Sequence, residues 1–181
     1  MPESDCSLAL TLDCGQAFRF VKTEDGVFEG VVYGRILRMQ QKKEEIRFFD
    51  MALSEFEERY VSYFDMNTDY AALKAQFSSD QILQKAISCT SGIRVLRQDG
   101  FETLISFLIS QNNNIPRIKK SIYLLCARFG KQLAPDAYTF PTAEILAARR
   151  PEDLAGLSLG YRDRYLLDAA KRVASGEIAL D

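Results

Sequence analysis

The sequence of 181 residues contains no histidine. This absence excludes Ser-His-Asp triads and Cys-His pairs as means of activating a nucleophile. It also argues against a zinc site, because no cluster of cysteines replaces the missing imidazoles. Any chemistry must therefore come from carboxylates, lysines, hydroxyls or thiols.

Long apolar segments are also absent, since no run reaches the roughly 18 residues that suggest a membrane-spanning helix. The first residues have neither the basic nor the apolar region of a secretory signal, so we expect an intracellular protein, in the cytoplasm or nucleoid of a bacterium or the nucleus of a eukaryote. The few cysteines are scattered, without a Cys-x-x-Cys pair, and we interpret them as structural thiols. We therefore expect no metal and no cofactor. The cysteines are Cys6, Cys14, Cys89 and Cys126.

Charge is divided unevenly along the chain, although the net charge is only -2. Residues 1–93 carry 10 Lys and Arg against 15 Asp and Glu, or -5, whereas residues 94–181 carry 13 against 10, or +3. A basic half indicates a surface that meets a polyanion. The excess is small, so an ordinary solvated surface remains the alternative.

The first half of the chain is patterned as short strands followed by helices. Five segments rich in Val, Ile, Phe and Leu are separated by turn residues, which predicts an antiparallel sheet. From residue 53 the apolar spacing becomes helical, and Asp or Ser residues suited to capping open two further helices. The expected strands are residues 7–12, 17–22, 27–33, 35–40 and 45–49, and the two further helices are residues 69–77 and 79–88.

After residue 92 only helical patterns occur. Apolar residues repeat at helical spacing behind Asp99, a suitable N-cap, and a second apolar stripe ends at Gly130. Shorter helices are expected at residues 142–148 and 151–155, with a last one after residue 161. The sequence therefore predicts an α+β fold, with a sheet covered by helices on one face in residues 1–91 and an all-α unit in residues 92–181.

Three consecutive asparagines, Asn112, Asn113 and Asn114, separate the two longest helical patterns. Asparagine carries donors and an acceptor on a short side chain, so the triplet offers many hydrogen bonds. One interpretation is a polar loop that caps the helix beginning near Pro116. The other is a loop that reaches bases or phosphates, with Arg117 supplying the charge.

Two further segments have a functional and an ordinary interpretation. Tyr161 and Arg162 open a helix after two glycines, which is typical of a phosphate site beside an aromatic ring that can stack on a base. A half-buried tyrosine with solvated arginines is the alternative. Gly15 lies in a tight turn before Gln16 and Phe18. It serves the turn, or it leaves a backbone carbonyl accessible to a ligand.

These motifs occur together and in order. The chain resembles the 8-oxoguanine DNA glycosylases of the helix-hairpin-helix superfamily at four places: residues 12–20 (Leu-Asp-Cys-Gly-Gln-Ala-Phe-Arg-Phe), 92–99 (Gly-Ile-Arg-Val-Leu-Arg-Gln-Asp), 110–118 (Ser-Gln-Asn-Asn-Asn-Ile-Pro-Arg-Ile) and 157–165 (Leu-Ser-Leu-Gly-Tyr-Arg-Asp-Arg-Tyr). The resemblance runs from about residue 5 to the end. It implies a twisted sheet like that of TATA-binding protein, followed by part of a helical glycosylase domain.

The resemblance implies a monomeric base-excision repair enzyme that flips 8-oxoguanine out of double-stranded DNA, where the lesion is paired with cytosine. In that reaction Asn112 would fill the space left by the flipped base, and Tyr161 would wedge the helix at the estranged cytosine. Arg117 and Arg162 would donate hydrogen bonds to the edge of that cytosine. The rest of the asparagine triplet, Asn113 and Asn114, would belong to the same DNA-binding loop.

For the lesion itself, the resemblance implies a substrate site at Gly15, Gln16 and Phe18. The Gly15 carbonyl would accept the N7 hydrogen that 8-oxoguanine has and guanine lacks. There are also departures from the family pattern. Gly100 stands where the family has proline, and Phe20 stands where it has tryptophan, but neither residue touches the implied chemistry.

The larger departure is the absence of a nucleophile. Members of the family place a Leu-Pro-Gly-Val-Gly-x-Lys hairpin further along the chain, whose lysine attacks the sugar C1′ to form a Schiff base, followed by a supporting aspartate. Residues 1–181 contain no such hairpin, and Lys171 lies in a helical pattern where a solvated lysine is the ordinary interpretation. We expect both catalytic residues after Asp181, and no strand cleavage by residues 1–181 alone.

Three other functions remain open at this point. The chain could be a non-catalytic DNA-binding or scaffold module, a glycosylase of the same superfamily that acts on alkylated bases, or a purely protein-binding α+β domain. The asparagine triplet argues against the second. Salt-dependent binding to a duplex would exclude the third, because phosphate contacts dominate such binding.

Overall fold

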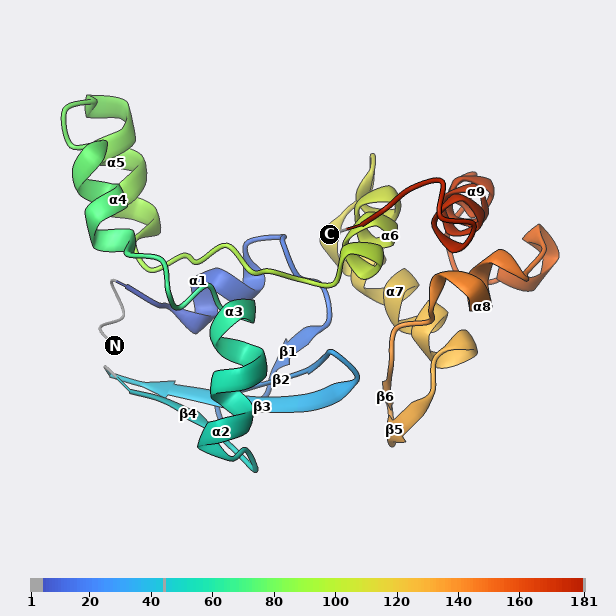
Figure 1. Cartoon of the computed structure of the whole chain (residues 1–181), viewed down its shortest axis with the longest axis horizontal. Coiled ribbons are helices and arrows are strands. Elements are labelled where there is room, and N and C mark those ends of the chain that lie inside the picture. The colour runs from blue at the N-terminus through green and yellow to red at the C-terminus, as the bar shows by residue number, and fades with distance from the viewer. Residues whose placement is uncertain (1–4, 44, 181) are drawn as a thin grey trace. The chain divides into compact units, whose positions relative to one another are not determined.

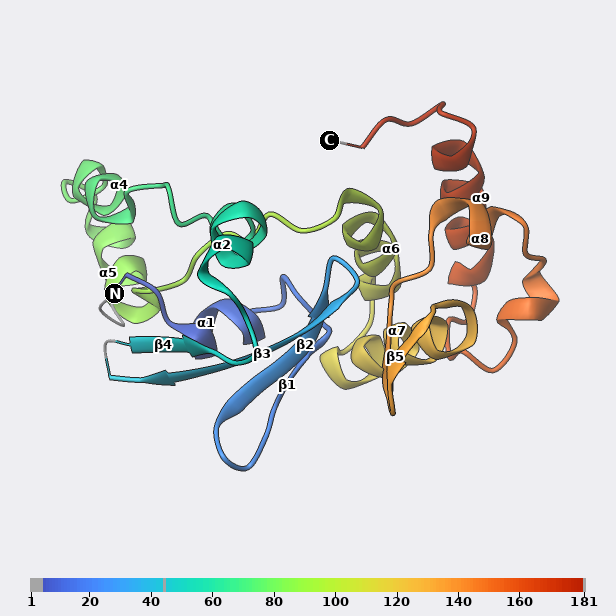
Figure 2. The same ribbon diagram turned by 60° about the horizontal axis from the view of Figure 1, so that its bottom comes forward.

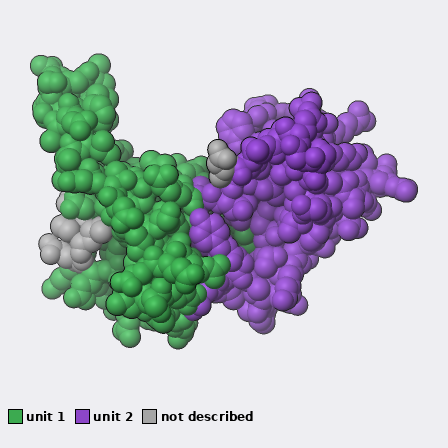
Figure 3. Space-filling view, viewed as in Figure 1, with its two compact units in different colours: residues 1–29, 37–97 green, residues 30–36, 98–181 purple. Residues whose placement is uncertain are grey.

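The chain divides into two compact units in a computed structural model that describes residues 5–43 and 45–180. One unit is residues 1–29 with 37–97, and the other is residues 30–36 with 98–181 (Figure 3). The domain boundary that we expect at residue 91 remains a prediction. Residues 1–4, which enter the expectation about a secretory signal, lie outside the described residues.

A four-stranded antiparallel sheet with the order β1-β2-β3-β4 organises the first half of the chain (Figure 1). Sequential strands are neighbours because short turns join them. In the last pair, Met39 lies opposite Phe48 and Lys42 lies opposite Glu45. The predicted antiparallel sheet is therefore confirmed. Its strands are β1 (Phe20–Lys22), β2 (Val27–Val32), β3 (Arg35–Lys42) and β4 (Glu45–Phe48).

Helices cover one face of this sheet, as Figures 1 and 2 both show. The ring of Phe48 on β4 contacts those of Phe56 and Phe64, at centroid distances of 4.7 and 5.7 Å. Removing apolar ring surface from water stabilises this layer, and the edge-on arrangement of Phe48 and Phe64 adds to it. The covering segments are α1 (Leu8–Asp13) and the continuous run of α2 (Leu53–Glu55), the π-helical η1 (Phe56–Tyr60) and α3 (Val61–Tyr63). The α+β class is confirmed.

Residues 7–12 are helical, so the strand expected there is wrong. Ser7 caps α1 by accepting the Leu10 N–H, and the buried positions of the helix are Leu8, Thr11 and Leu12. Their spacing of i, i+3 and i+4 is the helical one, which the alternating leucines of this short segment conceal. The side chain of Gln41 on β3 then fastens α1, because it accepts the Leu8 N–H at 2.8 Å.

Two capped helices, α4 (Tyr70–Gln76) and α5 (Gln81–Thr90), complete the first half. Asp69 caps α4 through the Ala72 N–H, and Asp80 caps α5 through the Leu83 N–H. Both caps lie in the segments where the sequence predicts helices. Neither helix buries a residue, and in Figure 1 both stand to one side of the sheet.

The second half is built from helices around an aliphatic core. Asp99 caps the first helix by accepting the Glu102 N–H at 2.8 Å, as the sequence predicts. The helical elements are α6 (Gly100–Ser110), α7 (Ile115–Phe129), α8 (Ala143–Ala147), the 3-10 turn η2 (Pro151–Leu154) and α9 (Arg162–Ala174). The fully buried core includes Ile105, Ile109, Ile122, Leu125, Leu146 and Leu166.

One hairpin in this half is not expected from the sequence, namely β5 (Gln132–Ala134) paired with β6 (Ala137–Tyr138). Strands this short carry too few residues for alternation to be recognised. The hairpin explains Gly130, the C-cap of α7, whose φ of -84° any residue could adopt. A Cβ on Gly130 would overlap the backbone carbonyl oxygen of Thr139, so glycine is needed for the close approach of two backbones.

We expect Gly130→Ala to lower the free energy of unfolding by about 1–3 kcal/mol, the usual cost of forcing an extra carbon into a packed position. Thermal and urea denaturation would measure this loss. Lys131→Ala, at the exposed neighbouring position, is the control and should change stability little. Equal stability of Gly130→Ala and the wild type would show that the hairpin moves away freely.

Candidate nucleic-acid interface

The three asparagines between α6 and α7 have different surroundings. The Asn114 side chain caps α7 by accepting the Arg117 N–H at 3.0 Å. The Asn113 amide donates to the Ile109 carbonyl in the last turn of α6, also at 3.0 Å. Two of the three therefore hold helix ends, in agreement with the capping interpretation.

Asn112 differs from its neighbours in both backbone and side chain. Its φ is +47°, a left-handed conformation that asparagine adopts more readily than most residues. The residue is exposed, and its side chain makes no hydrogen bond to any residue in the described part of the chain. The loop thus presents one amide to solvent on a backbone that the other two asparagines fix.

Arg162 is almost fully buried at the start of α9, with 5% of its surface exposed. Its Nε donates to the Gln111 carbonyl at 3.1 Å, and its Nη2 donates to the same carbonyl and to that of Asn112 at 3.0 Å. Its Nη1 donates to the Leu159 carbonyl at 3.1 Å. A buried charge is tolerated when hydrogen bonds satisfy it in this way. One guanidinium therefore joins the asparagine loop to the turn before α9.

Tyr161 projects from the same turn and is 58% exposed. The guanidinium carbon of Arg162 lies 4.7 Å from the centroid of its ring, within the range of a cation–π contact. Tyr165, one helical turn further, meets the ring edge-on at 6.1 Å. Arg162 thus lies against the face of the Tyr161 ring, and Tyr165 makes the edge-on contact. The two tyrosines also line an open pocket together with Gly160, Asp163 and Arg164.

Arg117 lies on the exposed first turn of α7, three residues after the N-cap Asn114. Among the residues that the structure describes, none forms a hydrogen bond or ion pair with its side chain. Lys120, one turn further, is also exposed. Positive charge is thus available beside the asparagine loop, as the sequence predicts.

The predicted substrate residues belong to the first unit. Gly15 is exposed with a φ of +89°, which favours glycine, and the position of an added Cβ meets open space. The Gln16 side chain is not extended to solvent, since its Nε2 donates to the Thr11 carbonyl at 2.9 Å and to the Arg94 carbonyl at 2.8 Å. Phe18 is partly buried. The Gln16 side chain therefore stabilises the turn that contains Gly15.

Arg94 is a residue that the sequence analysis does not single out, although it lies within a quoted motif. It is 4% exposed, and its Nη1 donates to the Asp65 carbonyl at 2.6 Å while its Nε donates to the Asp5 carbonyl at 2.9 Å. The available signal is an arginine inside the apolar segment Gly-Ile-Arg-Val-Leu. An arginine with apolar neighbours on both sides of the chain indicates a charge that is buried and satisfied.

Asp65 and Tyr70 next to Arg94 have shifted pKa values. Burial raises the pKa of Asp65, but hydrogen bonds from Tyr70, Thr68 and Arg97 outweigh it and hold the pKa below the ordinary 3.8. Burial raises the pKa of Tyr70 above 10.0, and the bond to the Asp65 carboxylate adds to this effect. At neutral pH the pair is a carboxylate and a phenol.

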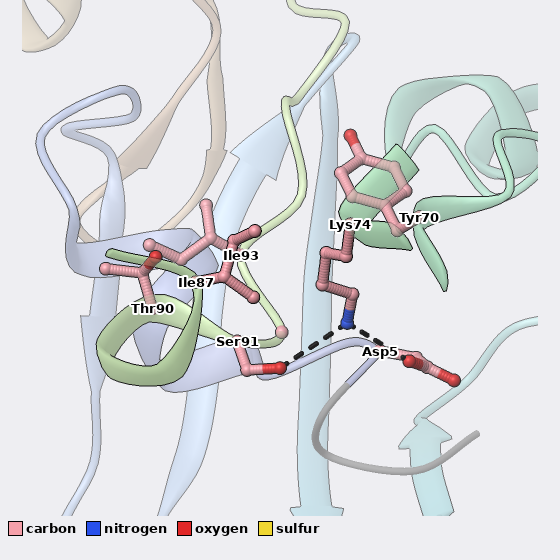
Figure 4. Close-up of a pocket in the computed structure, with 8 residues that line it drawn as sticks. Asp5, Tyr70, Lys74, Ile87, Thr90, Ser91 and Ile93 are labelled. Carbon is pink, nitrogen blue, oxygen red and sulfur yellow. Dashed lines mark hydrogen bonds and ion pairs between the residues drawn. The ribbon is translucent and has the colours of Figure 1, made fainter. Parts of the chain in front are cut away.

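A pocket of about 190 Å³ lies beside Tyr70, lined by residues of α4, of the last turn of α5 and of the segment that follows (Figure 4). The Lys74 ammonium points into it and lies 3.4 Å from both the Asp5 carboxylate and the Ser91 hydroxyl. The two charged groups of the pocket are thus paired with each other. Within residues 5–43 and 45–180, no group of three or more Cys, Asp or Glu could hold a metal ion, and no helix is both long and apolar enough to cross a membrane.

Comparisons with known proteins bear on this arrangement. The family described as "8-oxoguanine DNA glycosylase, N-terminal domain" matches residues 1–104. An N-glycosylase/DNA lyase of Saccharomyces cerevisiae is 29% identical over 96% of this chain and 51% of its own length. The chain thus spans about half of that relative.

Two solved structures are similar in both sequence and fold. MBOgg1 in complex with a low-affinity DNA ligand is 40% identical, with a TM-score of 0.92 over 97% of this chain and 62% of that one. The Clostridium acetobutylicum 8-oxoguanine glycosylase/lyase, in complex with double-stranded DNA containing cytosine opposite 8-oxoguanine, is 36% identical, with a TM-score of 0.90 over 96% of this chain and 61% of that one. With more than half of its residues matched by the family, the chain belongs to the 8-oxoguanine DNA glycosylases.

Proposed function

We propose that residues 1–181 supply the lesion-reading and duplex-opening surfaces of a base-excision repair enzyme. The whole protein would remove 8-oxoguanine opposite cytosine from double-stranded DNA and act as an AP lyase, as an intracellular monomer. One observation supports this proposal above the others. Asn112 and Tyr161 are both exposed, and the buried guanidinium of Arg162 contacts both the backbone carbonyl of Asn112 and the ring of Tyr161. The Clostridium relative binds DNA of this kind.

Base flipping opens the stack at the target nucleotide. The target atoms of a base are inaccessible inside the stack, so the enzyme must extrude the nucleotide and fill the gap that remains. In the proposal, the short polar side chain of Asn112 occupies the gap, and the Tyr161 ring enters the stack beside the estranged base. A ring supported by Arg162 and Tyr165 loses little conformational freedom on insertion, which favours a wedge.

Arg117 is the proposed reader of the estranged cytosine. Cytosine without its partner presents O2 and N3 acceptors, which an arginine fork can contact with two donors. Arg117 is exposed and carries its charge beside the loop that would fill the gap. Its contact would disfavour an opposite adenine, whose Watson–Crick edge has a C2–H group where cytosine has the O2 acceptor.

Gly15 is the proposed reader of the lesion. Its carbonyl would accept the N7 hydrogen of 8-oxoguanine, a neutral hydrogen bond worth about 1 kcal/mol net, with Gln16 fixing the turn and Phe18 beside it. An exposed residue at a φ of +89° leaves room for a base to approach the backbone. The same contact cannot form with guanine, because guanine has a lone pair at N7.

For Arg162 the resemblance and the geometry favour different roles. The resemblance implies donation to the cytosine edge. In this structure its donors go to the carbonyls of Gln111, Asn112 and Leu159, and reaching a base would cost those bonds. We therefore propose that Arg162 acts mainly by holding Asn112 and Tyr161 in place.

The reaction at the sugar requires residues outside this set. Removing the base and cleaving the strand through a Schiff base needs a lysine amine, and an aspartate to support its attack. Residues 1–181 lack the hairpin motif that carries the lysine in the family. The alternative is a non-catalytic module that retains only the DNA-binding surface.

Replacing Arg117 tests the reading of the estranged base. We expect Arg117→Ala to weaken binding to an 8-oxoguanine:C duplex by about 5- to 150-fold, equivalent to about 1–3 kcal/mol, and to reduce the preference for C over A. Fluorescence anisotropy across a salt series would measure both effects. Arg172→Ala, which removes an equal charge from the last turn of α9, is the control. The same loss in both variants would indicate only a charge effect.

Replacing Arg162 distinguishes its two proposed roles. Arg162→Lys keeps the charge but loses the fork, so it should lower the melting temperature and weaken binding equally whether C, A, G or T lies opposite the lesion. The fluorescence of 2-aminopurine next to the lesion should also report less flipping. A loss confined to the C duplex, with an unchanged melting temperature, would support direct donation to cytosine instead.

Borohydride trapping tests the absence of a nucleophile. With an 8-oxoguanine:C duplex, a polypeptide of residues 1–181 should bind but give no covalent adduct, since its sequence lacks the hairpin motif that carries the family's lysine. Denaturing electrophoresis would detect the adduct, and a complete family member provides the positive control. An adduct with residues 1–181 would mean that a lysine of this chain serves as the nucleophile.

A further inference from the structure

The Gln16 side chain fastens the loop that carries Gly15. Besides its bonds to the carbonyls of Thr11 and Arg94, Gln16 accepts the Leu96 N–H on its Oε1 at 2.9 Å. Thr11 adds a second link, because its hydroxyl accepts the Arg94 N–H at 3.1 Å. The position of the Gly15 backbone therefore depends on where residues 94–96 lie.

The segment of residues 94–97 is in turn fixed by Asp65. The Asp65 carbonyl accepts the Arg94 guanidinium at 2.6 Å, and its carboxylate accepts Arg97 Nε at 3.2 Å. The same carboxylate accepts the Tyr70 hydroxyl at 2.9 Å. That hydroxyl accepts the Val95 N–H at 2.9 Å, which forms a relay from a backbone amide through a phenol to a carboxylate.

The relay is directional, and each of its bonds strengthens the next. A phenol that donates to an ionised carboxylate is a better acceptor, so the Val95 N–H is held more firmly. Arg94 also lies over the Tyr70 ring, 4.5 Å from its centroid. Asp65 itself is only 8% exposed and has a φ of +50°, a left-handed backbone that aspartate adopts more readily than most residues.

We infer that Asp65 and Tyr70 are positioning residues for lesion recognition, which fix residues 94–96 and, through Gln16, the Gly15 carbonyl. This inference rests on the proposed function of Gly15. A hydrogen bond weakens steeply when its geometry departs from the best one, so a contact that separates two bases differing at N7 needs a fixed acceptor. The ion pair between Asp65 and Arg97 contributes little to stability, because the Arg97 side chain is 65% exposed.

Tyr70→Phe is the decisive variant. It removes only the hydroxyl of the relay and keeps the ring under Arg94. The wild-type chain should bind an 8-oxoguanine:C duplex about fivefold more tightly than a G:C duplex of the same sequence, the factor that one neutral hydrogen bond provides. In Tyr70→Phe this ratio should fall towards one while affinity for the G:C duplex stays unchanged. Asp65→Asn, which is nearly isosteric, should change the ratio in the same direction.

Thr68→Val is the matched control, because Thr68 donates to the same carboxylate at 2.9 Å but lies outside the relay. It should keep the wild-type ratio. Amide chemical shifts of residues 15–17 in DNA-free protein give a second measure, and they should move in Tyr70→Phe but not in Thr68→Val. Circular dichroism would confirm that all the variants are folded.

The possible outcomes separate this inference from the function on which it rests. If the wild type discriminates and Tyr70→Phe does so equally, with unchanged shifts at residues 15–17, the positioning role is wrong and the reading by Gly15 stands. If the wild type itself shows a ratio of one, the reading by Gly15 is wrong and the positioning role falls with it. A loss of affinity that is equal for both duplexes would show a purely structural role.

Discussion

A buried guanidinium must have its N–H groups satisfied, and in meeting this condition Arg162 joins the asparagine loop to the turn before α9. Its donors go to backbone carbonyls at Gln111 and Asn112 on one side and Leu159 on the other. Carbonyls at the end of α6 have no helical partners of their own, so the arginine also completes that helix end. Moving the loop away from α9 would leave a buried cation without partners, which typically costs several kcal/mol. The loop and the turn are therefore coupled before any DNA is bound.

The first unit also contains a buried arginine, Arg94, whose donors are satisfied by backbone carbonyls. Like Arg162, it lies over a tyrosine ring. Arg162 holds the exposed backbone at Asn112 directly. The Arg94 guanidinium holds the carbonyls of Asp5 and Asp65, and its own backbone carbonyl accepts the Gln16 side chain beside Gly15. Loops of this kind have no ladder of backbone hydrogen bonds to define them, so a side chain with several donors in a fixed plane takes that role. A lysine could match the charge, but it lacks the planar fork.

The sequence predicts the regular elements better than the irregular ones. Alternation and turn residues locate the four strands, and the caps Asp99 and Asn114 are recognisable because capping chemistry is local. The helix at Leu8–Asp13 and the β5–β6 hairpin escape prediction because both are too short for their periodicity to show. The burial of Arg162 could not be predicted from the sequence either. Tyr-Arg-Asp-Arg has the composition of a solvated helix start, and its interior position depends on partners some fifty residues away. Within the asparagine triplet, Asn113 and Asn114 hold helix ends, as the capping interpretation predicts, whereas Asn112 faces solvent.

Magnitudes indicate why recognition should depend on positioned backbone. If a single neutral hydrogen bond separates 8-oxoguanine from guanine, it provides about 1 kcal/mol, or roughly a fivefold preference, whereas undamaged guanine is in vast excess in DNA. Additional charge would not improve this selectivity, since phosphate contacts stabilise both complexes equally. A rigid acceptor can improve the selectivity, because the lone pair on N7 of guanine then meets a carbonyl lone pair that cannot move aside. This repulsion adds to the loss of the hydrogen bond. A carbonyl at a glycine held by Gln16 suits this purpose better than a flexible side chain. If Gly15 reads the lesion as proposed, the buried polar network behind it would contribute to recognition together with the carbonyl that contacts the base.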